Sequence, residues 1–150
     1  MPQIKIKQHD ISDCGAACLA SVAAHYRLQF PIARIRQYAG TDQKGTNLLG
    51  LMEAAQKLGF QAKGVRAEVR DLLALPLPTI AHVVLKNGLH HYVVVYKVST
   101  KTVEVMDPGP GEMETSYFKN KIGILLGFSS GYLLFTNWIQ VKQFLFSFFM

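Results

Sequence analysis

The chain has 150 residues, of which 49% are apolar, and this is enough for one domain built around one hydrophobic core. The formal net charge is +6, but the lysines and arginines are scattered, without the dense basic run of a nucleic-acid-binding arm. The first residues, Met1 to Lys7, lack the apolar core of a secretory signal peptide. We therefore expect a single domain that has no nucleic-acid partner and remains in the cytoplasm.

Apolar spacing and capping residues predict helices in the first half of the chain, over Cys14–Tyr26, Pro31–Tyr38 and Leu48–Leu58. Ser12 or Asp13 is suited to cap the first helix, because a short polar side chain can accept a hydrogen bond from an unpaired backbone N–H group. Thr46 or Asn47 is suited to cap the third, and Gly59 ends it.

Runs rich in β-branched and aromatic residues predict strands in the second half, over Gln61–Val69, Thr79–Leu85, His91–Val98, Thr102–Met106 and Tyr132–Thr136. Lys86-Asn87-Gly88 separates two of these runs, and Asn-Gly is a strong signal for a hairpin. The stretch Asp107–Gly111, rich in proline and glycine, is expected to break the sheet. Helices first and antiparallel strands second predict an α+β domain.

The two cysteines, Cys14 and Cys18, are four residues apart on the first predicted helix. Side chains one turn apart leave a helix in similar directions, so no disulfide is expected between them. Free thiols fit a reducing, cytoplasmic setting. We expect Cys18 to be a core residue. A zinc site formed by both thiols and histidines is the alternative, although the Cys-x-x-x-Cys spacing is not that of common zinc sites.

Cys14 is placed at the start of its helix, where unpaired N–H groups and the helix dipole favour the reactive thiolate and can stabilise an oxyanion. Gly15 is expected to leave space for a substrate backbone. Gln8 lies six residues earlier, and its side-chain amide is a candidate donor to the same oxyanion. The ordinary alternatives are an inert core cysteine and a polar surface glutamine.

A thiolate nucleophile needs a base, usually a histidine, and that histidine needs an orienting group. His91 begins a predicted strand, and His90 points to the other side of it, so only one of them can be the base. Asp107 ends the next strand, which the short turn makes antiparallel to the first, and it can therefore lie near the histidine. A surface histidine and a turn aspartate before Pro108 are the alternatives.

The final segment, Asn137–Met150, is rich in Trp, Phe, Leu and Ile, but Gln140, Lys142 and Gln143 interrupt it. It is too short and too polar to span a bilayer, which needs about 20 apolar residues. It is expected either to pack on a surface, of the core or of a membrane, or to lead toward a membrane segment beyond this chain.

Several motifs occur together in this chain: Gln8 with Asp13-Cys14-Gly15-Ala16-Ala17-Cys18, His91-Tyr92-Val93-Val94-Val95, Asp107-Pro108, and the segments Gly45–Gly59 and Leu75–His82. Their combination resembles the C39 peptidase family, the N-terminal protease domains of bacteriocin-processing ABC transporters. The resemblance extends from near Gln3 to near Thr136. Each motif alone is unspecific, and the combination is specific.

The resemblance implies a papain-like fold, with Cys14 as the nucleophile and His91 as the general base and then the general acid. It implies that Asp107 orients His91 and that Gln8 donates to the oxyanion. No cofactor and no metal are implied. The implied substrate is a peptide precursor whose leader binds as an amphipathic helix and ends in a double-glycine-type motif, after which the chain is cut.

The resemblance also implies a place in a larger protein. Residues 1–136 are expected to be the peptidase domain, and residues 137–150 an apolar linker toward a transporter membrane domain, on the cytoplasmic face of the membrane. The partners are then the transmembrane and nucleotide-binding domains of that transporter, since this chain has no Gly-rich phosphate loop. A non-catalytic substrate-docking domain is the alternative, because some exporters resemble this family but lack the cysteine.

Overall fold

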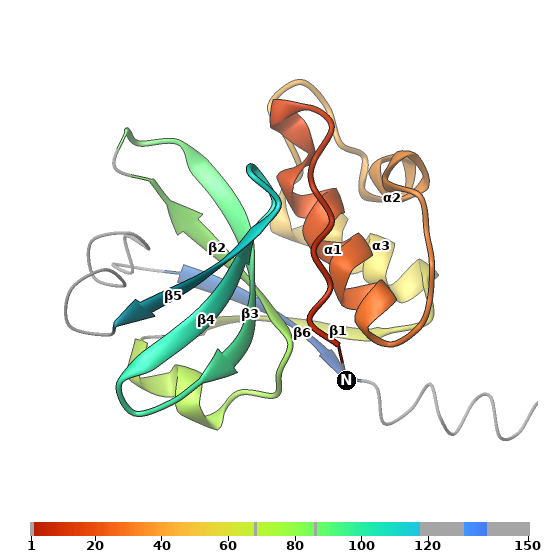
Figure 1. Cartoon of the computed structure of the whole chain (residues 1–150). Coiled ribbons are helices and arrows are strands. Elements are labelled where there is room, and N and C mark those ends of the chain that lie inside the picture. The colour runs from red at the N-terminus through yellow and green to blue at the C-terminus, as the bar shows by residue number, and fades with distance from the viewer. Residues whose placement is uncertain (1, 68, 86, 118–130, 138–150) are drawn as a thin grey trace, which may run out of the picture.

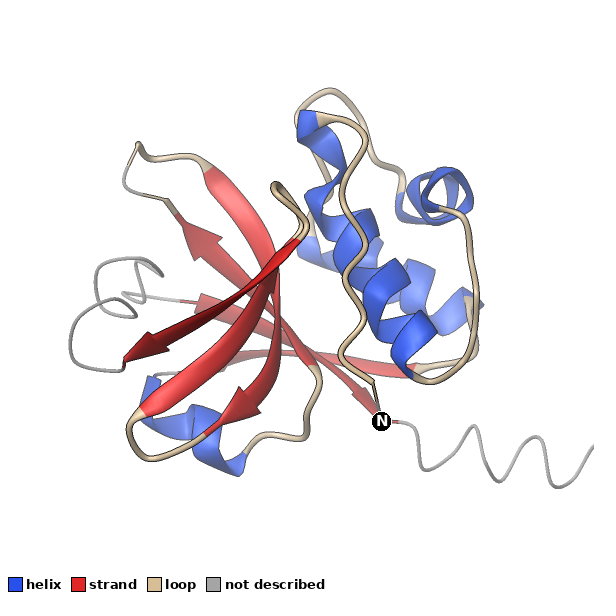
Figure 2. Cartoon of the chain, viewed as in Figure 1, coloured by secondary structure: helices blue, strands red, loops and turns tan. Residues whose placement is uncertain are grey.

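The structure is a computed structural model that describes residues 2–67, 69–85, 87–117 and 131–137. Figure 1 shows a group of helices beside a twisted sheet, and Figure 2 shows the same division by element type. The helices come from the first part of the chain and the strands from the second. The predicted α+β class is therefore confirmed.

Three α-helices of the described chain lie where the sequence predicts them, within one residue at each end: α1 Cys14–His25, α2 Ile32–Ala39 and α3 Leu48–Lys57. The Asn47 side chain caps α3 by accepting a hydrogen bond from the Gly50 N–H at 2.8 Å. Gly40, which follows α2, adopts a left-handed conformation with φ of 63°, a common way to end a helix.

The start of α1 differs from the prediction. A 3-10 turn, η1 (Ile11–Asp13), precedes the helix, and the Asp10 side chain caps this turn by accepting a hydrogen bond from the Ser12 N–H at 3.3 Å. Asp13 occupies the cap position of α1, but its carboxylate accepts the Asp10 N–H at 3.0 Å instead of a helix N–H. The first N–H groups of α1 are therefore not capped by a side chain of Ser12 or Asp13.

The described strands form one antiparallel sheet in the order β1-β6-β2-β3-β4-β5. Their bounds are β1 Gln61–Ala67, β2 Thr79–Val84, β3 His90–Val98, β4 Thr102–Asp107, β5 Glu112–Tyr117 and β6 Gly131–Asn137, and a 3-10 turn η2 spans Val69–Ala74. β2 and β3 form the hairpin predicted from Asn87-Gly88, and Gly88 has a positive φ of 81° in the turn. All five predicted strands are present.

The sequence does not predict β5. The stretch Asp107–Gly111 was expected to break the sheet, but it turns the chain back, with the Gly111 N–H donating to the Asp107 carbonyl at 2.9 Å. β5 then pairs with β4 over six residues at the edge of the sheet. Its sequence, Glu-Met-Glu-Thr-Ser-Tyr, is polar and charged, which is common for edge strands but gives little strand signal.

β6 is inserted between β1 and β2, although it is the last described strand along the chain. Its backbone pairs with all of β1 and with Thr79–Ala81 of β2. The predicted apolar linker lies, apart from Asn137, outside the described residues. In the part of the chain that is described, no helix combines the length and the apolar character needed to cross a bilayer.

Both faces of the sheet are covered by apolar side chains. On one face, Tyr92, Val94 and Tyr96 of β3 join a core with the buried residues of α1, α2 and α3. On the other face, Val93 and Val95 pack in a second cluster with residues of β2, β4 and η2. This alternation along β3 fixes α1 against the centre of the sheet, so that the start of α1 lies near the start of β3.

The N-terminal segment, residues 2–8, runs along α1 between the helices and the sheet (Figure 1). The Tyr96 hydroxyl donates to the Ile4 carbonyl at 2.7 Å, and the Ile6 N–H donates to the Ser21 hydroxyl at 3.1 Å. The Gln8 N–H donates to the Pro108 carbonyl at 2.8 Å. The segment is thus attached to α1, β3 and the β4–β5 turn, and these bonds fix the position of Gln8.

Candidate active site

Cys14 is the first residue of α1, and its exposed fraction is 7%. The preceding turn is held by Asp13, whose buried carboxylate accepts an N–H bond from Arg36 of α2 at 2.6 Å as well as the Asp10 N–H. A carboxylate buried to this degree needs such a cation, because an unpaired buried charge is costly. The ion pair therefore fixes the backbone that presents Cys14 at the helix start.

Cys18, one turn further along α1, is fully buried in the helical core, as predicted. Burial raises the pKa of its thiol well above the usual value, with smaller contributions from the charges of Cys14 and Asp107. Both cysteines are free thiols. Among the described residues, no three potential ligand side chains of His, Cys, Asp or Glu gather in a group that could hold a metal ion.

His91 and Asp107 meet at the ends of two neighbouring strands. The pairing of Val94 with Met106 places His91 and Asp107 on the same face of the β3–β4 pair. The His91 Nε2 lies 2.8 Å from the Asp107 Oδ1, which also accepts the Gly109 N–H at 2.8 Å. These hydrogen bonds fix the orientation of the imidazole ring.

The pKa of His91 is strongly perturbed. Burial alone would lower it, but hydrogen bonds with Asp107 and with the Cys14 thiol, together with the charges of these two groups, outweigh burial and raise it to about 9. Burial would raise the pKa of Asp107, but the hydrogen bonds from His91 and from the Gly109 N–H lower it below its usual value. His91 therefore links the thiol to the carboxylate, and at neutral pH the imidazolium form is favoured.

Gln8 lies near this group, at the end of the N-terminal segment, although it is far from His91 in the sequence. Its Nε2 donates to the Asp10 carbonyl at 3.0 Å, and its Oε1 is buried with no hydrogen-bond partner among the described residues. A buried polar atom without a partner costs roughly 1–3 kcal/mol and often marks a functional site. Gln8 also lines a hollow with His91, so its amide is close to the predicted chemistry.

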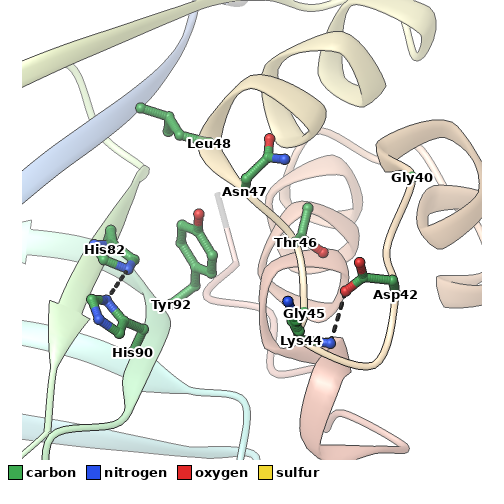
Figure 3. A pocket seen from close by; sticks show the side chains of 10 residues that line it. All are labelled: Gly40, Asp42, Lys44, Gly45, Thr46, Asn47, Leu48, His82, His90 and Tyr92. Carbon is green, nitrogen blue, oxygen red and sulfur yellow. Dashed lines mark hydrogen bonds between the residues drawn. The ribbon is translucent and has the colours of Figure 1, made fainter.

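Two adjoining hollows lie between the helical half and the sheet, and they share Lys44 and His90. The first hollow, of about 480 Å³, is shown in Figure 3 and is lined by Gly40, Asp42, Lys44, Gly45, Thr46, Asn47, Leu48, His82, His90 and Tyr92. The second hollow, of about 440 Å³, is lined by Gln8, Ile11, Ser12, Gln43, Lys44, Leu85, Gly88, Leu89, His90 and His91. We call the two together the groove.

Gly15 packs against two residues that line the first hollow. A Cβ atom at this position would lie 3.3 Å from both the Thr46 Cβ and the Tyr92 Cδ2. The absence of a side chain therefore lets these two walls of the hollow approach α1. Gly15 thus has a packing role, and the expectation that it leaves space for a substrate backbone stays a prediction.

The sequence did not single out His82, which lines the first hollow beside His90. Their rings are stacked with centroids 5.0 Å apart, and the His90 Nδ1 lies 3.1 Å from the His82 Nε2 (Figure 3). The pKa of His82 is lowered by burial and then by the charges of His90 and His91. The Asn-Gly turn could have indicated the position of His82. The hairpin register that this turn sets places His82 opposite Tyr92, which also lines the first hollow.

A thiol at a helix start, next to a histidine that a carboxylate orients, is the arrangement found in cysteine peptidases. The chain belongs to the peptidase C39 family, whose family model matches residues 3–134. Its α+β architecture is the papain-like fold of that family. The resemblance deduced from the sequence is therefore confirmed.

Two curated relatives are much longer than this chain, which matches only a small part of each. The lactococcin-G-processing and transport ATP-binding protein LagD of Lactococcus lactis subsp. lactis is 38% identical over 126 residues, which are 81% of this chain and 18% of that protein. The pediocin PA-1 transport/processing ATP-binding protein PedD of Pediococcus acidilactici is 41% identical over 116 residues, which are 76% of this chain and 16% of that protein. This chain thus spans less than a fifth of either relative.

Two solved structures share the fold over most of the chain. The peptidase domain of Streptococcus ComA, a bifunctional ABC transporter, has a TM-score of 0.79 and 33% identity, covering 90% of this chain and 98% of that domain. A double-glycine-motif protease from an AMS/PCAT transporter, solved in complex with a leader peptide, has a TM-score of 0.73 and 27% identity, covering 88% and 89% of the two chains.

Proposed function

We propose that this chain is a cysteine endopeptidase that removes the leader from a ribosomal peptide precursor by cutting after a double-glycine-type motif. The observation that carries the proposal is the 2.8 Å hydrogen bond between His91, which lines the groove, and Asp107, together with the Cys14 thiol, whose interaction with His91 helps to raise the pKa of the imidazole. Two similarities support the substrate class: the relatives process and transport lactococcin G and pediocin PA-1, and the double-glycine-motif protease was solved with a leader peptide.

In this proposal the Cys14 thiolate attacks the carbonyl carbon of the glycine before the cut. The oxyanion accepts hydrogen bonds from the uncapped N–H groups at the start of α1 and from the Gln8 amide. His91, held by Asp107, gives its proton to the leaving amine, which departs with the rest of the precursor. Water then attacks the thioester, His91 accepts a proton, and the leader leaves as a carboxylic acid while the Cys14 thiolate is restored.

The proposal includes a setting. The relatives are ATP-binding transport proteins, so we propose that this domain works with the transmembrane and nucleotide-binding domains of an exporter, at the cytoplasmic face of the membrane. Residues 138–150, which continue from β6, would then form the apolar linker toward the membrane domain. The leader would bind as an amphipathic helix outside the cut site.

A substrate-docking domain without activity is the second candidate, and Cys14 separates it from the first. The experiment incubates the purified domain and its Cys14→Ala variant with a double-glycine precursor and follows the products by mass spectrometry. Wild-type protein is expected to cut after the second glycine, and the variant to bind the leader with similar affinity but not to cut. Binding without cleavage by wild-type protein would favour the docking domain, and cleavage by the variant would exclude Cys14 as the nucleophile.

The close packing of Thr46 and Tyr92 on Gly15, at the wall of the first hollow, supports the requirement for a small residue before the cut. Replacing the glycine next to the cut by phenylalanine is expected to lower the cleavage rate at least 100-fold, while an alanine is tolerated better. Efficient cleavage of the phenylalanine peptide, measured under the same conditions, would contradict a narrow site.

A further inference from the structure

The two hollows of the groove differ in which of the proposed catalytic residues line them. His91 and Gln8 are among the described residues that line the second hollow, and neither lines the first. The chain passes from Ser12, which lines the second hollow, through Cys14 to Gly15, which packs against walls of the first. Along the chain, Cys14 is therefore flanked by a residue that lines the second hollow and by one that packs against the walls of the first.

This placement sets the direction of a bound peptide. The group that protonates the leaving amine must be within hydrogen-bond reach of that nitrogen, about 2.6–3.2 Å. The nitrogen belongs to the first residue after the cut, so that residue must lie beside His91. The peptide after the cut then continues into the second hollow, and the glycines before the cut occupy the first.

The second hollow has an apolar rim formed by Ile11, Leu85 and Leu89. Ile11 on η1 is 77% exposed and Leu89 at the end of the β2–β3 turn is 52% exposed, so both can be covered by a bound peptide. The turn holds two of the three together, because the Leu85 N–H donates to the Leu89 carbonyl at 2.8 Å. One side chain thus comes from the helical half and two from the sheet, on the two walls of the hollow.

The charges of the second hollow are all potentially positive. Lys44, His90 and His91 line it, and none of the described lining residues has a carboxylate. A cationic side chain after the cut would therefore meet repulsion, whereas an apolar one can cover the exposed rim. Burial of apolar surface on both partners favours such a contact.

We infer that the apolar rim selects the substrate on the product side: an apolar side chain at one of the first two positions after the cut is preferred. The inference rests on the proposed function and deepens it, since it concerns the peptide that is released rather than the leader. One apolar group in a hydrophobic site changes kcat/KM by about tenfold or more, and the open rim places the expected effect near tenfold.

The test compares precursors that differ only after the cut, with leucine, serine or lysine at the first or the second position. At one of the two positions, kcat/KM for leucine is expected to exceed that for serine by about tenfold, with lysine below serine. In the double variant Ile11→Ser/Leu89→Ser the leucine-to-serine ratio is expected to fall to about twofold or less. The matched control is Leu73→Ser on η2, because Leu73 is 56% exposed and does not line either hollow, and it should keep the full ratio.

The outcomes separate this inference from the proposed function. If none of the precursors is cut, the proposed function fails and the inference fails with it. If all are cut but leucine and serine give equal kcat/KM at both positions, the proposed function stands and the inference is wrong. A ratio that survives in the Ile11→Ser/Leu89→Ser variant, or one that is lost equally in Leu73→Ser, would also overturn the role of the rim.

Discussion

The first and second turns of α1 carry the same residue type in different surroundings. Cys14 begins the helix, and its thiol interacts with His91, which lines the groove. Cys18, one turn later, is fully buried among apolar side chains of the helical core, and burial raises the pKa of its thiol. Since both are free thiols on one helix, the difference between them comes from their neighbours and not from the residue itself.

The comparison teaches what a reactive cysteine needs. A helix start supplies N–H groups, and a histidine held by a carboxylate supplies a positive partner that favours the thiolate. Cys18 has neither, because its N–H is inside the helix and its surroundings disfavour any charge. The predictions that follow test whether this division between the two turns is as complete as the structure indicates.

The largest expected effect is the loss of cleavage when His91, the partner of Cys14, is replaced. His91→Ala is expected to lower the cleavage rate at least 1,000-fold, because the alanine removes the group that links the thiol to Asp107. His90→Ala is the matched control from the adjacent position, and a loss of no more than about tenfold is expected, since His90 is exposed and bonds to His82. Steady-state cleavage assays compare the two, and equal losses would show that the base is misassigned.

The next largest effect is in thiol reactivity. At neutral pH, iodoacetamide is expected to modify Cys14 in the folded protein at least 100-fold faster than Cys18, because Cys14 interacts with the His91 imidazolium at the helix start and Cys18 is fully buried. Peptide mapping by mass spectrometry after timed quenching gives both rates. Denatured protein should react at both thiols at similar rates, and a similar rate for the two in folded protein would remove the contrast.

The titration of His91 is expected to be displaced upward. Its pKa of about 9 should appear in an NMR titration and should fall in Cys14→Ala and in Asp107→Asn, which each remove one of the groups that raise it. A raised folded-state pKa stabilises the fold fully below the ordinary value of about 6.5, and this contribution is lost as the pH rises through about 9. The free energy of unfolding should therefore fall by roughly 2 kcal/mol more in wild-type protein than in His91→Asn between pH 7 and pH 10. A His91 that titrates near 6.5, or equal falls in the two proteins, would contradict the proposed interactions.

The smallest effect is expected when a hydroxyl replaces the Cys18 thiol. Cys18→Ser is expected to lower the free energy of unfolding by about 1–3 kcal/mol, because it buries a polar group in an apolar core, while activity per folded molecule stays within about twofold. Cys14→Ser should show the opposite pattern, with little change in stability and loss of cleavage. Urea unfolding and cleavage assays measure both, and a loss of activity in fully folded Cys18→Ser would assign Cys18 a role beyond packing.

The sequence predicts those features that depend on neighbouring residues. The three helices have local capping and apolar spacing, and the β2–β3 hairpin has an Asn-Gly turn, so both are found where expected. The short turn also predicts that β3 and β4 are antiparallel neighbours, but the register shift between Val95 and Lys97, which the sequence does not predict, is what places His91 and Asp107 on the same face.

Other features depend on contacts that leave no local pattern. The capped turn η1 and the Arg36–Asp13 ion pair join residues that only tertiary packing brings together. The edge strand β5 has a charged sequence, and its pairing with β4 is enough to form it. The apolar rim of the groove was likewise not predicted, because it combines η1 with the β2–β3 turn, which are more than 70 residues apart in the sequence.

The position of β6 has a consequence for how the domain is made. Since β6 lies between β1 and β2, the sheet stays divided during synthesis until the segment Gly131–Asn137 has left the ribosome. Pairings between segments so distant along the chain form slowly, and unpaired edges of β1 and β2 can meanwhile pair with other chains. A version of the domain that stops before Gly131 should therefore aggregate, although it would contain Cys14, His91 and Asp107.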